Sequence, residues 1–91
     1  MEWKLFADLA ETAGERRVDV DTAPDATVAD ALDALLESHP ALRERILSDG
    51  EVADHVNVLL NGEDVETRDR GLETPVESTD ELALFPPVSG G

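Results

Sequence analysis

The sequence predicts one small α+β domain in which a single main helix crosses one face of a mixed sheet. Three observations support this fold class. The chain has only 91 residues, which suffices for one hydrophobic core. Several short segments alternate apolar and polar residues as strands do, whereas one longer segment repeats apolar residues at helical spacing.

The N-terminal part is predicted to form an opening hairpin. Residues 2–7 alternate well enough for a strand, and residues 17–21 alternate strictly, as expected for a half-buried antiparallel partner. A loop at 12–15 turns the chain between them. The alternation places Lys4 and Phe6 on the opposite face of the first strand from the apolar positions, which are Trp3, Leu5, Val18 and Val20.

The main helix is predicted to begin after Thr27 and to end before Pro40. Thr27 is a suitable N-cap with Asp30 three residues later, and proline disfavours helical backbone in the residue before it. The apolar residues recur at i, i+4, i+7 and i+8, which builds one buried face. These positions are Val28, Leu32, Leu35 and Leu36.

The second half of the chain is predicted to supply the remaining strands. A short helix over 41–47 is closed by Asp49-Gly50, and a central strand over 55–60 ends in the tight-turn pair Asn61-Gly62. The last three segments are a short strand around 64–65, a polar loop over 67–79 that tucks Leu72 and Val76 against the core, and a final strand over 81–85.

This order of elements is the β-grasp arrangement. Residues 1–86 are expected to form the domain, and residues 87–91 a flexible tail. The sheet face under the helix is predicted to carry Trp3, Leu5, Val18, Val20, Val56, Val58, Leu60, Leu82 and Leu84. Strand parity places Phe6, Leu59 and Phe85 on the other face, where grouped apolar residues are typical of a partner surface, unless a loop or the tail covers them.

The composition is strongly acidic. The chain has 22 acidic and 7 basic side chains, a net charge of -15, and Lys4 as its only lysine. We expect an acidic surface adapted to concentrated salt, because the Debye length falls to about 3 Å at 1 M. No basic stripe is apparent along the chain, which argues against binding to nucleic acid or to an anionic membrane.

Candidate catalytic and metal-binding groups are few. The chain has no cysteine, so it has no thiolate nucleophile and no Cys-containing metal site. Ser38-His39 and Asp54-His55 contain the residue types of a Ser-His-Asp triad. A catalytic arrangement is not expected from them, because the side chains of adjacent residues are expected to point apart. The many carboxylates lack the spacing of a calcium loop, so neither a metal site nor a bound cofactor is expected.

The C-terminal segment is the most informative motif. Gly90-Gly91 has no side chains and can enter a channel too narrow for a Cβ atom. Pro86-Pro87 is expected to hold the preceding segment extended and away from the domain. The terminal carboxylate must be activated, for example as an acyl-adenylate, before it can react as an electrophile.

Several segments carry a resemblance to a known family. Leu5-Phe6-Ala7, Ala26-Thr27-Val28, Val56-Asn57-Val58 with Asn61-Gly62, and above all the last twelve residues, from Asp80 through Pro86-Pro87-Val88-Ser89 to Gly90-Gly91, resemble the MoaD and ThiS class of ubiquitin-like sulfur carriers. Among them the chain is most similar to MoaD and to the small archaeal modifier proteins of salt-loving archaea.

The resemblance implies a carrier that has no catalytic residues of its own. An E1-like enzyme would use ATP to adenylate the Gly91 carboxylate after recognising the tail, Pro86, Pro87, Val88, Ser89 and Gly90. Attack by a lysine of a target protein would then give an isopeptide bond, whereas sulfur transfer to the activated group would give a thiocarboxylate. A thiocarboxylate would serve a MoaE-type large subunit in molybdopterin synthesis, and a desampylating metalloprotease could remove the modifier. Phe6, Leu59 and Phe85 would contact these partners.

Three further expectations accompany this interpretation. The N-terminus has no signal segment and no apolar run long enough to cross a bilayer, so a cytoplasmic monomer is expected. Lys4 is the only internal lysine at which a modifier chain could form, although a solvent-facing strand lysine is the plainer interpretation. The alternative function is a noncovalent β-grasp interaction domain with an incidental tail.

Overall fold

The computed structural model describes residues 1–53, 56–67 and 70–85, and the backbone alone of Glu66. A five-stranded sheet has the order β2-β1-β7-β5-β6. Its strands are β1 (Glu2–Leu5), β2 (Arg17–Asp19), β5 (Asn57–Leu60), β6 (Glu63–Asp64) and β7 (Glu81–Phe85). The last strand is therefore central. It pairs in parallel with β1 and antiparallel with β5, which confirms the predicted α+β fold with a mixed sheet.

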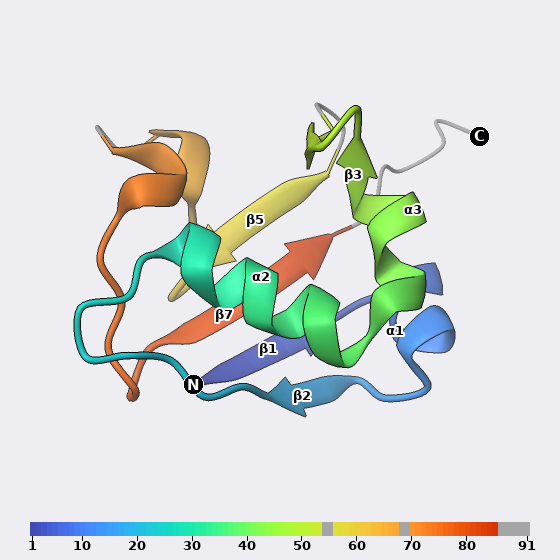
Figure 1. Cartoon of the computed structure of the whole chain (residues 1–91), viewed down its shortest axis with the longest axis horizontal. Coiled ribbons are helices and arrows are strands. Elements are labelled where there is room, and N and C mark those ends of the chain that lie inside the picture. Colours follow the sequence, from blue (N-terminus) through green and yellow to red (C-terminus); the bar gives the residue numbers. More distant parts are fainter. Residues whose placement is uncertain (54–55, 68–69, 86–91) are drawn as a thin grey trace.

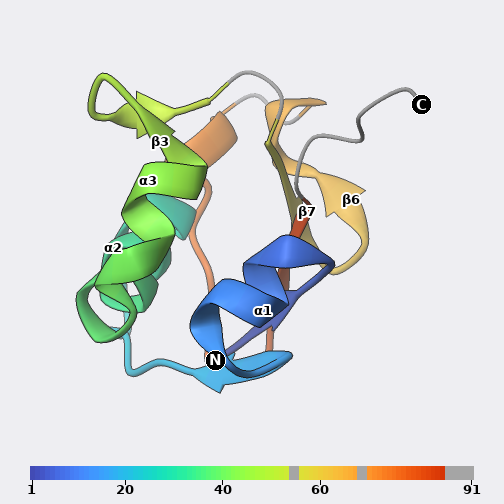
Figure 2. The ribbon, with the colours of Figure 1, turned by 90° about the vertical axis from the view of Figure 1, so that its right-hand side faces the viewer.

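The main helix, α2 (Val28–Ser38), crosses one face of this sheet (Figure 1). The predicted capping box is present: the Asp30 amide donates to Thr27 Oγ1 at 3.3 Å, and the Thr27 amide donates to Asp30 Oδ2 at 3.0 Å. After it come the 3₁₀ turn η1 (Pro40–Leu42) and α3 (Arg43–Ile46). Figure 2 shows α2 and α3 on the same side of the sheet.

The core lies between α2 and the sheet, and every residue predicted for the covered sheet face is buried. Trp3 is 0% exposed, and its indole Nε1 donates to the Ala31 carbonyl of α2 at 3.0 Å. Because a buried indole N–H needs an acceptor, this bond fixes how the first strand and the helix face one another. The helix contributes Val28, Ala31, Leu32, Leu35 and Leu36 to the same core.

The first prediction that the structure corrects concerns residues 6–13. The strand ends at Leu5, and α1 (Asp8–Ala13) occupies most of the segment between the hairpin strands. Leu9 is buried, and Gly14 ends the helix at φ 80° with its amide donating to the Ala10 carbonyl at 2.9 Å. A six-residue helix has too few turns to show periodicity, so its burial and its glycine cap define it.

The second correction concerns Asp49-Gly50. This pair was expected to close a helix, but it joins β3 (Leu47–Ser48) to β4 (Glu51–Val52) in a small separate hairpin. Asp49 has φ 54° and Gly50 φ 83°, and Asn61 and Gly62 repeat this at φ 50° and 85° between β5 and β6. Two consecutive positive φ values are what a two-residue type I′ hairpin turn requires.

The polar segment after β6 contains two short 3₁₀ turns, η2 (Val65–Thr67) and η3 (Gly71–Glu73). Val76 is buried and Leu72 packs against the core, as predicted. The amide of Val76 donates to the Ala26 carbonyl at 2.9 Å, which ties this segment to the start of α2. The predicted boundary between domain and tail, at 86–87, lies outside the described residues and stays a prediction.

Candidate functional site: an aromatic pair and a basic hollow

The sheet face that α2 does not cover presents a defined row of side chains. Pairing aligns Arg17 with Lys4, Lys4 with Ala83, and Ala83 with Leu59. Because side chains alternate along a strand, these four residues share the face opposite the buried core. Phe85 lies two residues beyond Ala83, on the same face.

Phe6 and Phe85 form a stacked pair at this face. Their ring centroids are 4.3 Å apart and their planes differ by 9°. Phe6 follows the end of β1 and is 38% exposed, which makes it the exposed large hydrophobic side chain of the described chain. The alternation of side chains along the strands predicted that the two rings lie on the same face of the sheet, and the structure adds that they contact one another.

Leu59, the third predicted member of the partner surface, is half-buried and does not enter the stack. It sits opposite Ala83, whereas Phe85 sits opposite Asn57. Leu59 is therefore a diagonal neighbour of Phe85, and such neighbours lie about 7–8 Å apart on one face of a sheet. The surface is an aromatic pair flanked by one leucine.

The predicted tail residues, Pro86, Pro87, Val88, Ser89, Gly90 and Gly91, lie outside the described residues. The structure describes β7, the strand that precedes them in the sequence. Phe85 is the last residue of β7, whose two neighbours in the sheet are β1 and β5. Phe85, the residue that precedes the tail in sequence, therefore lies at the end of a central strand and beside Phe6.

Lys4, the predicted acceptor lysine, is on the open face as expected. Its side chain is 31% exposed, and Nζ lies 3.1 Å from Glu81 Oε1. Glu81 is 47% exposed, so water competes for this ion pair. A half-exposed lysine in such a pair is accessible to a reacting group.

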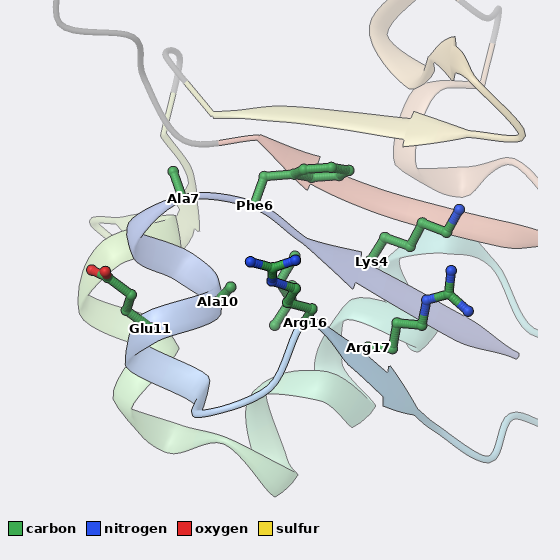
Figure 3. A pocket seen from close by; sticks show the side chains of 8 residues that line it. Lys4, Phe6, Ala7, Ala10, Glu11, Arg16 and Arg17 are labelled. Carbon is green, nitrogen blue, oxygen red and sulfur yellow. The ribbon is translucent and has the colours of Figure 1, made fainter.

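A surface hollow of about 530 Å³ lies beside the aromatic pair (Figure 3). It is lined by Lys4, Leu5, Phe6, Ala7, Ala10, Glu11, Arg16 and Arg17. Arg16 and Arg17 are exposed. The expectation that the chain has no local basic region is therefore wrong, because the β1–β2 hairpin brings Lys4 next to two arginines that follow it at a distance in sequence.

The Ser38-His39 pair also departs from its prediction. The two side chains do not point apart, since Ser38 Oγ lies 3.0 Å from His39 Nδ1 and His39 Nε2 lies 3.2 Å from Glu15 Oε2. The serine hydroxyl, however, donates to the Leu35 carbonyl at 3.0 Å. The Leu35 carbonyl therefore competes with the imidazole, which a nucleophilic serine needs as its base, for the single hydroxyl proton. The cluster closes the C-terminal end of α2. Asp54 and His55 lie outside the described residues.

The described residues hold neither a metal-binding cluster nor a membrane-spanning helix. No group of three or more His, Asp or Glu side chains there is placed to hold a metal ion. None of the helices in this part of the chain has the length and apolar character needed to cross a bilayer.

The chain is similar to a known protein family and to a small archaeal modifier protein over nearly its whole length. A family model described as the ThiS family matches residues 3–91. Small archaeal modifier protein 1 of Haloferax volcanii is 61% identical over 92 residues, with all of both chains covered. Its crystal structure matches with a TM-score of 0.90 at 61% identity, covering 100% of this chain and 98% of that one.

Two more distant relatives carry other descriptions. A candidate sulfur carrier protein of Archaeoglobus fulgidus is 43% identical over 49 residues, which is 53% of this chain and 54% of that protein. The structure of a candidate molybdopterin converting factor subunit 1 from Pyrococcus furiosus matches at a TM-score of 0.76 and 25% identity, covering 96% and 95% of the two chains.

Proposed function

The chain belongs to the ThiS family, and we propose that it is a ubiquitin-like protein modifier and sulfur carrier whose Gly91 carboxylate is activated by a partner enzyme. The observation that carries the proposal is the full-length likeness to a small archaeal modifier protein, because it includes the terminal Gly90-Gly91. The relatives are described as modifiers and carriers, which supports a carrier role rather than an enzymatic one.

The proposed activation takes place on the partner and not on this chain. An E1-like enzyme holds ATP, and a carboxylate oxygen of Gly91 attacks the α-phosphorus so that pyrophosphate leaves. The resulting acyl-adenylate has AMP as a good leaving group. A lysine amine that displaces AMP and loses a proton gives an isopeptide bond, whereas hydrosulfide that displaces AMP gives a thiocarboxylate. The carrier contributes no acid or base to either step.

The geometry near Phe85 supports this role. An enzyme that acts on the tail has to bind the domain close to the point where the tail begins. The Phe6–Phe85 pair is at that point, is partly exposed and is apolar, which are properties of an interface anchor. β7 has a neighbouring strand on each side, so Phe85, the last described residue before the tail, belongs both to a central strand and to the anchor.

The finer partner assignments belong to the same proposal. Likeness to a candidate molybdopterin converting factor subunit supports a MoaE-type large subunit as the acceptor of the thiocarboxylate sulfur. Likeness to a modifier protein supports lysines of target proteins, and a desampylating metalloprotease that reverses the modification. We propose that the cofactor requirement of the system, ATP, is met by the activating enzyme.

The test is the intact mass of the protein after incubation in molar KCl with the host's E1-like enzyme, ATP and a sulfur donor. We expect one terminal oxygen to be replaced by sulfur. The matched control is the chain that lacks Gly91, which should keep its fold and its original mass. An unchanged mass of the full chain, with an enzyme shown to be active on another carrier, would contradict the proposal.

One observation favours a second candidate, a noncovalent interaction domain. Phe6 is a large apolar side chain that is exposed on the sheet face and not buried in the core. The aromatic pair could therefore bind a partner protein with or without the chemistry of the tail. Two variants separate the candidates. Loss of Gly91 should abolish function only for the carrier, whereas Phe85→Ala should impair both.

A further inference from the structure

The basic hollow is unexpected in a chain of this charge. Three of the seven basic side chains, those of Lys4, Arg16 and Arg17, line one hollow, although acidic residues number 22. Figure 3 shows Lys4 and Arg17 side by side on their strands and Arg16 beneath Phe6, while Glu11 extends from the far side of α1. Arg16 and Arg17 are neighbours in sequence, and the pairing of β1 with β2 places Lys4 opposite Arg17.

The two arginines of the hollow also form no ion pair with a carboxylate of residues 1–53, 56–67 and 70–85. In the described residues, ion pairs join Lys4 to Glu81, His39 to Glu15, and Arg45 to Asp8. Arg16, Arg17, Arg43 and Arg70 take part in none of these pairs, although carboxylates are three times as common as bases, and of these four only Arg16 and Arg17 line the hollow. Guanidinium groups that are left without a carboxylate in such a chain are available for a carboxylate of another molecule.

The pairing of the strands points in the same direction. Lys4 and Arg17 are directly opposite one another on β1 and β2, and like charges at directly opposite positions destabilise a sheet. Only one of them, Lys4, has a neutralising neighbour. The fold thus tolerates a small electrostatic cost at this place, which an anionic partner would offset.

The hollow has an apolar side as well. Phe6 and Ala10 contribute to its wall next to the guanidinium of Arg16. Its volume of about 530 Å³ is in the range of pockets that bind drug-sized molecules, which leaves room for a few side chains of a peptide. Charge and shape together suit a short peptide that carries both carboxylates and an aliphatic group.

We propose that this hollow binds an acidic segment of a protein partner, with carboxylates on Arg16 and Arg17 and an aliphatic side chain against Phe6. The net charge of -15 does not prevent this in concentrated salt. At about 1 M the screening length is about 3 Å, so charges in contact dominate over the field of the whole molecule. This contact is independent of the chemistry at Gly91 and would orient a partner already held by the aromatic pair.

The experiment is a titration of the full, isotope-labelled chain in molar KCl, followed by NMR of the backbone amides and the arginine side chains. The probe is a blocked peptide that alternates glutamate and leucine, and the control probe replaces each glutamate with glutamine. Shift changes confined to residues 4–7, 10 and 16–17, and seen only with the glutamate peptide, are expected. Equal shifts with both peptides, or none, would overturn the proposal.

Variants make the assignment specific. Arg16→Gln and Arg17→Gln should each weaken binding of the glutamate peptide about tenfold, because each removes a charge-assisted hydrogen bond to a carboxylate. The matched control is Arg43→Gln on α3, an exposed arginine away from the hollow, which should leave binding unchanged. Equal effects of all three variants would contradict the assignment.

Two other anions serve as competitors. Inorganic phosphate and a short single-stranded RNA are added separately to the peptide complex. The proposal expects the peptide to remain bound when either is present at equal concentration. Displacement by phosphate or RNA at that concentration would show a phosphate site and would overturn the assignment to an acidic protein segment.

Discussion

The stack between Phe6 and Phe85 allows a quantitative test of the candidate surface. The variants are Phe6→Leu, Phe85→Leu and the double variant, because leucine keeps an apolar side chain but removes the ring. Aromatic pairs contribute about 0.5–1.5 kcal/mol beyond the area they bury. Since Phe6 is 38% exposed, we expect a coupling energy near the lower end, at about 0.5–1 kcal/mol.

The assay is urea unfolding in molar KCl, followed by tryptophan fluorescence. Trp3 is the only tryptophan and is 0% exposed, so its emission should shift to longer wavelength when the core opens. A control cycle combines Phe6→Leu with Val76→Ala. Val76 contacts the start of α2 through its amide, away from the stack, so those two effects should add.

A coupling energy of zero in the Phe6 and Phe85 cycle would refute the contact between the rings. The same variants connect stability to function. Each single variant should lose less than about 2 kcal/mol of unfolding free energy, because the rings are at the surface. If the pair anchors the activating enzyme, thiocarboxylate formation by Phe85→Leu should fall well below what this modest destabilisation explains.

Four further outcomes are expected. Trp3→Phe should reduce the unfolding free energy by about 2–4 kcal/mol in urea unfolding followed by far-UV circular dichroism, since this variant has no tryptophan, because it removes buried volume and the bond to Ala31; a loss under 1 kcal/mol, on the order of a surface change, would contradict this. Asn61→Gly and Asn61→Ala both lose the hydrogen bonds to the Glu81 amide and the Asp80 carboxylate. Because glycine tolerates the positive φ of this position and alanine does not, Asn61→Ala should lower the urea midpoint more than Asn61→Gly does. Ala7→Gly should raise stability by about 1 kcal/mol, since Ala7 has φ 52° and ψ -130°; a lowered midpoint would argue against this backbone. Far-UV circular dichroism should show unfolding between molar and millimolar KCl, because repulsion within a net charge of -15 is no longer screened; an unchanged spectrum would exclude salt dependence.

The organism from which two of the relatives come agrees with the expected salt dependence of folding. The two modifier proteins that match over nearly their whole length, at 61% and 40% identity, are from Haloferax volcanii, a halophilic archaeon. The acidic composition with one lysine is therefore consistent with an adaptation to salt. The circular dichroism measurement tests that adaptation on this chain directly.

Local patterns in the sequence were enough to predict most of the fold. Alternation assigned the faces of β1, β2, β5 and β7, and the Thr27–Asp30 box with its apolar spacing located α2. The same parity placed Phe6, Leu59 and Phe85 on the open face. These features could be predicted because they repeat over several residues or combine two signals at a fixed spacing.

Short elements escaped prediction for a physical reason. α1 has six residues and one buried side chain, Leu9, and the β3–β4 hairpin has two residues in each strand. Such elements are not stable alone and carry no repeat. They exist because the rest of the fold buries them and provides partners for their ends.

The sequence by itself determined the order of the main elements, the two faces of the sheet, the acidic surface and the terminal motif whose chemistry Gly91 would carry. Only the tertiary structure decided which distant side chains meet. It stacked Phe6 on Phe85 and brought Lys4 beside Arg16 and Arg17. Local preferences act between near neighbours in the chain, whereas contacts between strands depend on register, and register is set when the whole core packs.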